Sequence, residues 1–257
     1  MEKEKVISVM KRYELKYYLN KEQLSYFMAK INDHMKVDKY GLTTIASLYF
    51  DTPDYRLINR SIEKPKFKEK LRLRSYGLAD EKSLTFLEIK RKCDGIVYKR
   101  RITLFESEAY ELILNKETSN KDQISRELEA FMENYHNLEP KYLIIYDRVA
   151  YYQDNSDLRI TIDMTPRYRT NDLNLHTSMD GISLLEDGGA ILEVKVQHSV
   201  PTWLAAILSE GKIYQTSFSK VGTAHKKEMA KKYIDIKQEV NVLSVNEKGR
   251  IRYGLAI

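Results

Sequence analysis

The stretch KFKEKLRLRSY, at Lys66–Tyr76, alternates between charged and apolar side chains. Successive side chains of a β-strand point to opposite faces, so this alternation predicts a strand with two different faces. The odd-numbered face is mostly apolar and is expected to cover a core. The even-numbered face is a row of cations, which are Lys66, Lys68, Lys70, Arg72 and Arg74.

Seven further segments alternate in the same way and are predicted to be strands. In chain order they are Lys11–Leu19, Thr44–Asp51, Leu84–Lys92, Ile96–Phe105, Tyr142–Tyr151, Leu158–Met164 and Ala190–Gln197. Two longer segments, Lys21–Met35 and Asp122–His136, repeat apolar residues at helical spacing, and Asn20 with Gln23 forms a predicted capping box before the first. Shorter helices are predicted at Ser107–Leu114, Thr202–Ser209 and His225–Tyr233. Many strands in succession indicate an α+β fold with a mainly antiparallel sheet, and the alternation alone leaves open whether it closes.

The composition is that of a globular protein with a substantial core. The 257 residues include 43 Lys and Arg against 37 Asp and Glu, which gives a net charge of +6. Cys93 is the single cysteine, so an intramolecular disulfide is excluded and a reducing compartment is indicated. No apolar run reaches the ~18–20 residues of a membrane span and the N-terminus lacks a signal-peptide pattern, so we expect a cytoplasmic protein. One domain is expected over residues 1–236, with 237–257 as a peripheral tail.

Cations collect on one face of strand after strand. By alternation, this face carries the basic residues Lys16, Lys70, Arg72, Arg74, Lys90, Lys99, Arg101, Arg148, Arg159 and Lys195 and the acidic residues Glu14, Glu88, Asp163 and Glu193. On any single strand the pattern is that of an ordinary solvated face. Like charges on neighbouring strands repel one another, so a face built repeatedly in this way indicates a polyanionic ligand that neutralises it. Carboxylates within such a site suit Mg²⁺ or Mn²⁺ carried on phosphate oxygens.

Nine short motifs occur in order along the chain. They are RYELKY (Arg12–Tyr17), LYFDTPD (Leu48–Asp54), KLRLRSYG (Lys70–Gly77), EIKRK (Glu88–Lys92), VYKRR (Val97–Arg101), YDR (Tyr146–Arg148), LRITIDM (Leu158–Met164), LEVKV (Leu192–Val196) and SFSK (Ser217–Lys220). Together they resemble the VTC domain, the polyphosphate polymerase branch of the triphosphate tunnel metalloenzymes, from about Lys11 to Ala230. The resemblance implies a closed antiparallel β-barrel, or tunnel, with peripheral helices. It also implies transfer of the γ-phosphate of ATP onto a growing polyphosphate chain.

The resemblance further implies which residues act. By motif, it assigns phosphate binding to Lys16, Arg72, Arg74, Lys90, Lys99, Arg101, Tyr146, Arg148, Arg159 and Lys220, and the alternation adds Lys70 and Lys195. Glu193 is the implied ligand of Mn²⁺ or Mg²⁺, and Glu14, Glu88 and Asp163 are candidates to assist it. Because guanidinium groups make bidentate contacts with phosphate oxygens, we expect Arg72, Arg74, Arg148 and Arg159 to clamp the triphosphate. The expected ligands are ATP or another nucleoside triphosphate, together with polyphosphate, triphosphate or pyrophosphate.

Three classes of function are consistent with these residues. A polyphosphate-synthesising transferase is favoured. A hydrolase of the same fold, acting on triphosphate, nucleoside triphosphate or polyphosphate, would use water in place of the phosphate acceptor, and a non-enzymatic polyanion-binding module is the third. Nucleic acid is not an expected partner, since most tyrosines fall on apolar faces and not where bases could stack. The sequence lacks G-x-x-x-x-G-K-[ST], so it is not a P-loop ATPase, and any membrane partner is expected to be a separate chain.

Overall fold

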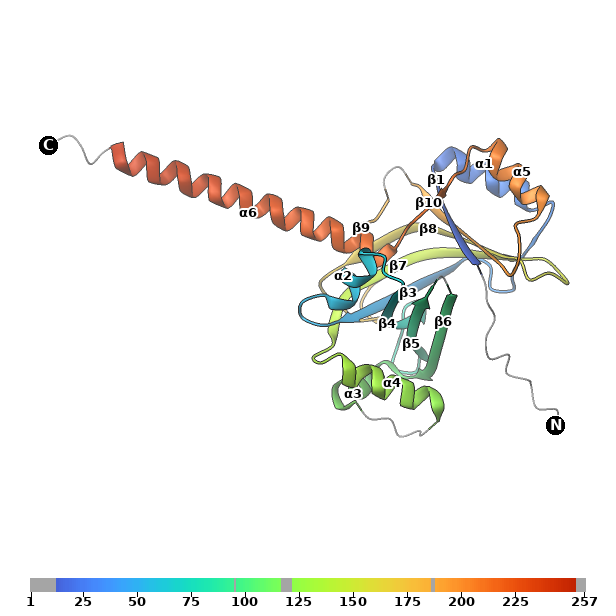
Figure 1. Ribbon diagram of the computed structural model, residues 1–257, viewed down its shortest axis with the longest axis horizontal. Helices are drawn as coiled ribbons and strands as arrows, with labels where there is room; N and C mark the ends of the chain where they lie inside the picture. The colour runs from blue at the N-terminus through green and yellow to red at the C-terminus, as the bar shows by residue number, and fades with distance from the viewer. Residues whose placement is uncertain (1–12, 95, 117–121, 186–187, 253–257) are drawn as a thin grey trace.

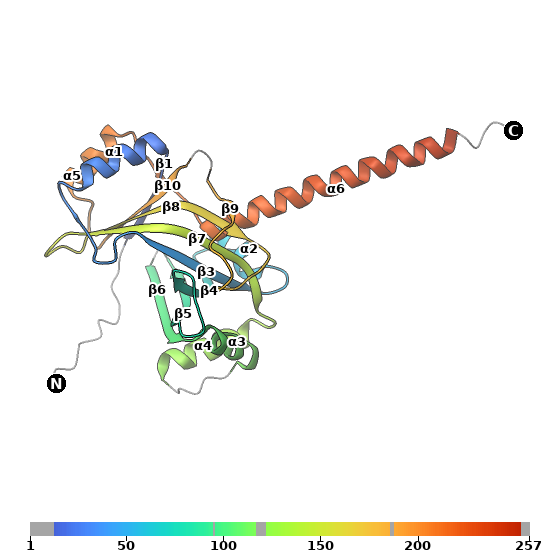
Figure 2. The same cartoon turned by 180° about the vertical axis from the view of Figure 1, so that it is seen from behind.

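One antiparallel sheet of eleven strands organises the chain (Figure 1). The computed structural model describes residues 13–94, 96–116, 122–185 and 188–252, with side chains up to residue 238. The strands are β1 (Tyr13–Leu19), β2 (Lys36–Val37), β3 (Thr43–Asp51), β4 (Phe67–Tyr76), β5 (Thr85–Cys93), β6 (Ile96–Leu104), β7 (Glu139–Tyr152), β8 (Arg159–Arg169), β9 (Ile182–Ser183), β10 (Ala190–Val196) and β11 (Gln215–Thr216). Their order is β11-β1-β10-β8-β7-β3-β4-β5-β6, with β2 beside β7 and β9 beside β8. Figure 2 shows the same sheet from behind, curled around one concave face.

All eight predicted strands are confirmed, and the differences lie at their ends. The predicted start of the first strand at Lys11 lies outside the described residues. β8 runs past its predicted end at Met164, because a bulge opposite Ile145 and Asp147 and the proline at Pro166 interrupt the alternation while the ladder continues. β7 starts at Glu139 and ends at Tyr152, just beyond its predicted bounds. The strands β2, β9 and β11 were not predicted, since two residues are too few to show any alternation.

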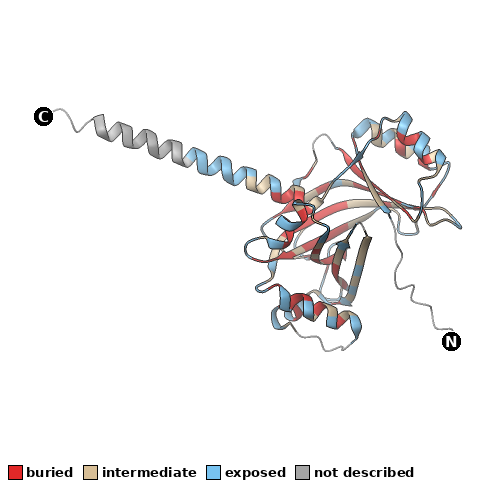
Figure 3. Cartoon of the chain, viewed as in Figure 1, coloured by how far each residue is buried: buried red, intermediate tan, exposed pale blue. Residues whose placement is uncertain are grey.

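Six helices are described, and four of them cover the convex face of the sheet over two cores. Within the described residues the six are α1 (Lys21–Ile31), α2 (Arg56–Ile62), α3 (Glu106–Asn115), α4 (Gln123–Asn134), α5 (Thr202–Glu210) and α6 (Lys220–Arg252). α1 and α5 pack on β1, β8 and β10, while α3 and α4 pack on β4 and β5 (Figure 1). Figure 3 shows the buried residues where these helices meet the sheet. The predicted capping box is confirmed, because Asn20 Oδ1 accepts the backbone N–H of Gln23 at 2.8 Å and Gln23 Oε1 accepts that of Asn20 at 3.1 Å.

Three helices differ from the sequence prediction, and the first is α1, which ends at Ile31 and not at the predicted Met35. α2 was not predicted, because its seven residues are too few for a helical period to be recognised. The helix predicted at His225–Tyr233 is part of α6, which has 33 residues, contains no proline and projects away from the sheet (Figure 1). Residue 237, the predicted start of a tail, therefore lies inside this helix. Among the helices described, none combines the length and the apolar character needed to cross a membrane.

The sheet is not closed by hydrogen bonds. β6 and β11 are its two edges, and within the described residues no ladder joins β6 to β1 or β11. The closed barrel expected from the resemblance is therefore not confirmed. A side-chain contact nevertheless crosses this opening, since Lys90 Nζ on β5 lies 3.4 Å from Glu14 Oε2 on β1. We call the space between β6 and β1 the seam.

Apolar side chains fill part of the concave face. Tyr142 and Tyr168 on β7 and β8 pack with Val221 at the start of α6, and Ile58 of α2 joins the same cluster. His225 is buried there, with Nδ1 3.0 Å from the hydroxyl of Tyr142. We call this cluster the apolar cap. It covers the concave face beside α2 and α6, and the polar side chains lie on the rest of that face.

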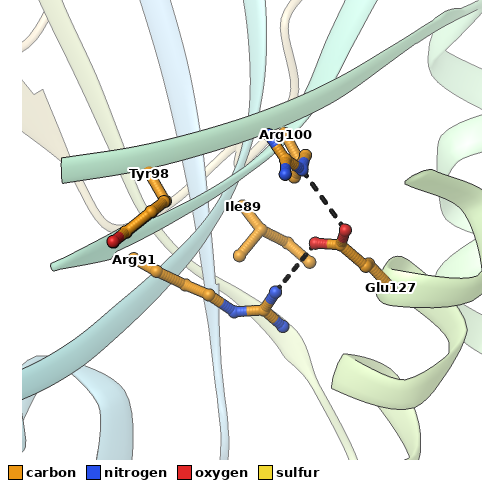
Figure 4. Close-up of a pocket in the computed structure, with 5 residues that line it drawn as sticks. All are labelled: Ile89, Arg91, Tyr98, Arg100 and Glu127. Atoms are coloured by element: carbon orange, nitrogen blue, oxygen red, sulfur yellow. Dashed lines mark hydrogen bonds and ion pairs between the residues drawn. The ribbon is translucent and has the colours of Figure 1, made fainter. Parts of the chain in front are cut away.

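A small pocket lies on the convex side, between β5, β6 and α4 (Figure 4). Arg91 and Arg100 both point toward Glu127, and Ile89 forms its floor. Arg91 also donates to Glu69 at 2.6 Å. The two arginines are thus balanced by two carboxylates, and these ion pairs attach α4 to the sheet.

Candidate functional site

The charged residues of the concave face form one cluster. It contains nine basic side chains and four carboxylates, contributed by six strands of the sheet, by β6 at its edge and by the first residue of α6. The members are Lys16, Lys70, Arg72, Arg74, Lys90, Lys99, Arg148, Lys195 and Lys220 with Glu14, Glu88, Asp163 and Glu193. We call this set the basic cluster. The strand alternation brings these side chains to one face, and the sheet curls around that face (Figure 2).

Glu88 pairs with two cations at the β5–β6 side of the basic cluster. Its side chain is fully buried, and Oε2 accepts the Nε–H of Arg72 at 2.7 Å while Oε1 pairs with Lys99. Burial raises the pKa of Glu88, but Arg72, Arg74 and Lys99 outweigh it and lower the pKa to about 2. Lys99 has its pKa lowered to about 8, chiefly by burial. Glu88 is therefore ionised and holds two cations in place.

Asp163 on β8 resembles Glu88, because it is a buried carboxylate that pairs with two cations. It is fully buried and pairs with Arg148 through both carboxylate oxygens, at 2.5 and 2.8 Å, and with Lys220. Burial raises the pKa of Asp163, and Lys220 and Arg148 outweigh it and lower the pKa below its usual range. Because Lys220 is the first residue of α6, this contact fixes the start of that helix over the sheet.

Glu193 is surrounded by cations from four elements. Lys16 and Lys195 lie 3.3 Å from its carboxylate oxygens, Arg148 3.6 Å and Lys220 3.8 Å. Burial raises the pKa of Glu193, but these cations, led by Lys16, hold the pKa well below its usual range. Lys16 also reaches Glu14 at 3.4 Å, so one ammonium group lies between two carboxylates.

Lys70 and Arg74 have no carboxylate contact among the described residues. Lys70 Nζ contacts Ser219 Oγ at 3.0 Å, and the guanidinium of Arg74 contacts Ser47 Oγ at 3.2 Å and the hydroxyl of Tyr146 at 3.1 Å. Burial, together with Lys16 and other nearby ammonium groups, lowers the pKa of Lys70 to about 7. Nine cations against four carboxylates leave an excess of positive charge in a half-buried space, which favours binding of a multiply charged anion.

Two residues of this region were not predicted from the sequence. Tyr49 on β3 lies opposite Arg72 in the ladder, and its hydroxyl accepts an N–H of Arg72 at 3.2 Å. Burial raises the pKa of Tyr49, but Arg72, Lys70 and Arg74 outweigh it and lower the pKa to about 7. Ser219, which accepts from Lys70, is the second. Alternation along β3 could have placed Tyr49 on the charged face. Ser219 lies in the segment before α6, where alternation gives no information.

Two predicted phosphate-binding residues lie outside the basic cluster. Arg159 is exposed at the start of β8, where its guanidinium donates to the backbone carbonyls of Ser156 at 3.1 Å and Leu158 at 2.9 Å. Arg101 is exposed on β6, with its guanidinium carbon 4.9 Å from the ring centroid of Phe86. Tyr146 is buried, and its hydroxyl contacts Arg74 as a lining group of the site.

The carboxylates allow a limited test of metal binding. Within the described part of the chain, no three Asp, Glu, His or Cys side chains are grouped closely enough to hold a metal ion by themselves. Glu14 and Glu193 do approach each other on either side of Lys16. Mg²⁺ is commonly held by one or two carboxylates together with substrate phosphates and water. The residues therefore fit a divalent ion that arrives with a phosphate ligand.

Comparison with known proteins agrees with this geometry. The VTC domain model matches residues 11–228 of the chain. Among solved structures, a candidate adenylate cyclase from Bacillus halodurans is similar, with a TM-score of 0.51, 15% identity, and coverage of 83% of this chain and 96% of that chain. A candidate adenylyl cyclase from Hippeastrum, described as having a dominant triphosphatase activity, gives a TM-score of 0.53 and 16% identity over 85% of this chain and 96% of that chain. At this identity the two structures show a shared fold alone. No curated protein matches the chain in sequence.

Proposed function

The chain belongs to the VTC domain family, and from this premise we propose that it is a polyphosphate polymerase, which transfers the γ-phosphate of ATP onto a polyphosphate chain. The observation that supports the proposal most is the excess of cations in the basic cluster. A polyphosphate chain carries about one charge per phosphate and would neutralise such a face over its length. The proposal places the enzyme in the cytoplasm, where ATP is available, as a single catalytic domain over residues 1–236 with 237–257 as a peripheral tail.

The basic cluster offers what phosphoryl transfer requires. Catalysis of this reaction depends on positioning the donor and acceptor in line and on neutralising charge on the transferred group. We assign the clamping of the donor phosphates to Arg72, Arg74 and Arg148, whose guanidinium groups suit bidentate contact. Lys16, Lys70, Lys90, Lys99, Lys195 and Lys220 would hold the acceptor chain and the product, and Arg159 would contact the chain at the rim. The attacking phosphate oxygen is already ionised, so no strong general base is needed.

A divalent ion, Mn²⁺ or Mg²⁺, would supply additional neutralisation of the phosphate oxygens when bound. Glu193 would contribute a carboxylate oxygen to it, with Glu14 nearest to assist. In the ligand-free protein, Lys16 occupies the space between these two carboxylates. Phosphate oxygens entering the site would draw Lys16 and Lys195 away from Glu193 and free its oxygens for the ion.

Closure of the barrel belongs to the same proposal. The seam separates cations on β5 and β6 from cations on β1 and β10, and Lys90 with Glu14 is a contact across it. A bound polyanion would bridge the two sides. We therefore expect the seam to narrow when phosphate binds.

A hydrolase is the second candidate, and the apolar cap favours it. The cap fills the concave face beside α2 and α6, which favours a site that substrates enter from the opposite side. A short substrate needs one entrance only. The ratio of products separates the two candidates: a polymerase releases ADP from ATP with much less than one equivalent of orthophosphate, whereas a hydrolase releases equal amounts.

A further inference from the structure

The concave face continues beyond the basic cluster into aromatic side chains. Tyr76 lies two residues after Arg74 on β4 and so shares its face, and Phe86 on β5 is the direct ladder partner of Arg74. The rings of Tyr76 and Phe86 meet edge to face, with centroids 5.6 Å apart and an interplanar angle of 79°. An aromatic pair therefore adjoins the last guanidinium of the clamp.

Arg101 extends this pair. Its guanidinium carbon lies 4.9 Å from the centroid of the Phe86 ring, in the range of a cation–π contact. Its ladder partner Glu88 is occupied by Arg72 and Lys99 and does not draw Arg101 into the basic cluster. The guanidinium covers Phe86 and presents its outer face to solvent.

The side chains around this aromatic pair remain open to solvent. Tyr76 is 51% exposed and Arg101 is exposed, while Phe86 is half-buried beneath them. A cross-strand aromatic pair would stabilise the end of the β4–β5 hairpin by itself. An open tyrosine ring beside an open guanidinium plane is also the surface on which nucleic-acid bases stack.

The spacing suits a nucleotide. Two residues along a strand span about 7 Å, so the backbone positions of Tyr76 and Arg74 are separated by about the length of a ribose. A base stacked at Tyr76 would direct its phosphates along β4 toward Arg74 and then Arg72. No rearrangement of the strand is required for this path, because all three side chains share one face.

Resting on the proposed function, we propose that Tyr76, Phe86 and Arg101 form the site that holds the base of the phosphate donor. The donor is then a nucleoside triphosphate and not inorganic triphosphate. Arg101 stacks on the base in this assignment and does not bind the transferred phosphates. Stacking uses the π-face that every base has, so the site accepts nucleoside triphosphates without selecting one base.

The test compares the dissociation constants of ATP and inorganic triphosphate, measured by calorimetry with the whole protein. Tyr76→Ala and Arg101→Ala should each weaken ATP binding roughly tenfold, since loss of one stacking partner typically has an effect of this size. Binding of inorganic triphosphate should stay within about twofold of the wild-type value. Tyr76→Phe keeps the ring and should keep ATP affinity. Tyr214→Ala removes a tyrosine that is 75% exposed in the segment before β11. It should leave the dissociation constants of both ligands unchanged.

Each opposing result has a distinct meaning. Equal losses for both ligands in Arg101→Ala would make Arg101 a phosphate-binding residue and overturn the base site. Unchanged ATP affinity in both alanine variants, with normal binding of inorganic triphosphate, would overturn the base site and leave the proposed function standing. Failure of the wild-type protein to bind either ATP or inorganic triphosphate would overturn the proposed function and the base site together.

Discussion

Glu193 on β10 lies directly opposite Lys16 on β1, and its Oε1 is 3.3 Å from the ammonium nitrogen. The ladder therefore fixes an acid and a base side by side in the centre of a site that has an excess of cations. In the ligand-free protein, Glu193 limits the repulsion among Lys16, Lys195 and Lys220. In the proposed enzyme it changes partner, from these lysines to a divalent ion, when phosphate oxygens enter.

Glu193→Gln should separate binding from catalysis. The substitution removes one negative charge and leaves every cation of the basic cluster, so triphosphate should bind as tightly as in the wild type or more tightly. Activity with Mn²⁺ should be lost, because the proposed carboxylate ligand is gone. Calorimetry with inorganic triphosphate and a polymerase assay measure the two effects. Wild-type activity in this variant would exclude Glu193 as a metal ligand.

Arg72→Ala should affect both stability and binding. It leaves the buried carboxylate of Glu88 with Lys99 as its remaining ion-pair partner, and breaking a buried pair costs on the order of 3 kcal/mol in the free energy of unfolding. Leu73→Ala, which truncates a fully buried side chain on the other face of β4, should cost about as much. Chemical denaturation measures both, and only the Arg72 variant should also lose triphosphate affinity.

The double variant Arg72→Ala with Glu88→Gln is the matched control. Neutralising Glu88 removes the unpaired charge, so most of the stability should return while triphosphate binding stays weak. Normal triphosphate binding in either variant would show that Arg72 serves the fold and not the ligand.

Lys70→Met should lower triphosphate affinity without the loss of stability expected for Arg72→Ala. Lys70 has no carboxylate contact among the described residues, and neighbouring ammonium groups repel it. The ligand-free protein should therefore keep or gain stability, measured as the free energy of unfolding. Triphosphate affinity should fall roughly ten- to a hundredfold, because charge-assisted hydrogen bonds contribute roughly 1.5–3 kcal/mol. A loss of stability with unchanged affinity would contradict this role.

The pH dependence of binding should reflect Lys70 and Tyr49 as a coupled pair. Both groups have their pKa lowered to about 7, so raising the pH through 7 removes a positive charge or adds a negative one next to Arg72. Triphosphate affinity should fall as the pH rises from 6 to 8. The fall should be smaller in Lys70→Met and in Tyr49→Phe than in the wild type, which separates it from ionisation of the ligand. Equal slopes in all three proteins would contradict the assignment.

The same two groups predict how stability changes with pH. Between pH 7 and about 10 the unfolded chain binds more protons at Lys70 and Tyr49 than the folded chain, because both pKa values are lowered on folding. The free energy of unfolding of the ligand-free protein should therefore rise over this interval. Denaturation curves for Lys70→Met should show a smaller rise than the wild type, and a wild-type decrease over the interval would contradict the prediction.

Alternation identified the face of most site residues because strand geometry fixes it. Lys16, Glu193 and Asp163 come from distant parts of the chain, yet the parity of each within its strand predicted their shared face. The odd or even position of a residue predicts its face but not how close it lies to the centre of that face. Arg159 and Arg101 therefore share the face with the basic cluster and still lie at its exposed rim. Alternation predicted the antiparallel sheet and the family resemblance added a closed barrel, which is not confirmed; narrowing of the seam on binding remains part of the proposal.

Features outside the strands were less accessible to sequence analysis. The contact of Ser219 with Lys70 depends on the path of the chain before α6, which no local period encodes. The apolar cap was also missed, because Val221 and Tyr142 become neighbours only through tertiary packing. Such contacts decide how much of the concave face stays open, and so they bear on the choice between polymerase and hydrolase.

Incubation of the purified protein with ATP labelled at the γ-phosphate, in the presence of Mn²⁺, tests the central claim most directly. Products are resolved by length on a gel, with Glu193→Gln as the inactive control. The account predicts a ladder of labelled polyphosphate that grows with time and is absent in the control. Labelled orthophosphate without any ladder would contradict it and assign the basic cluster to hydrolysis.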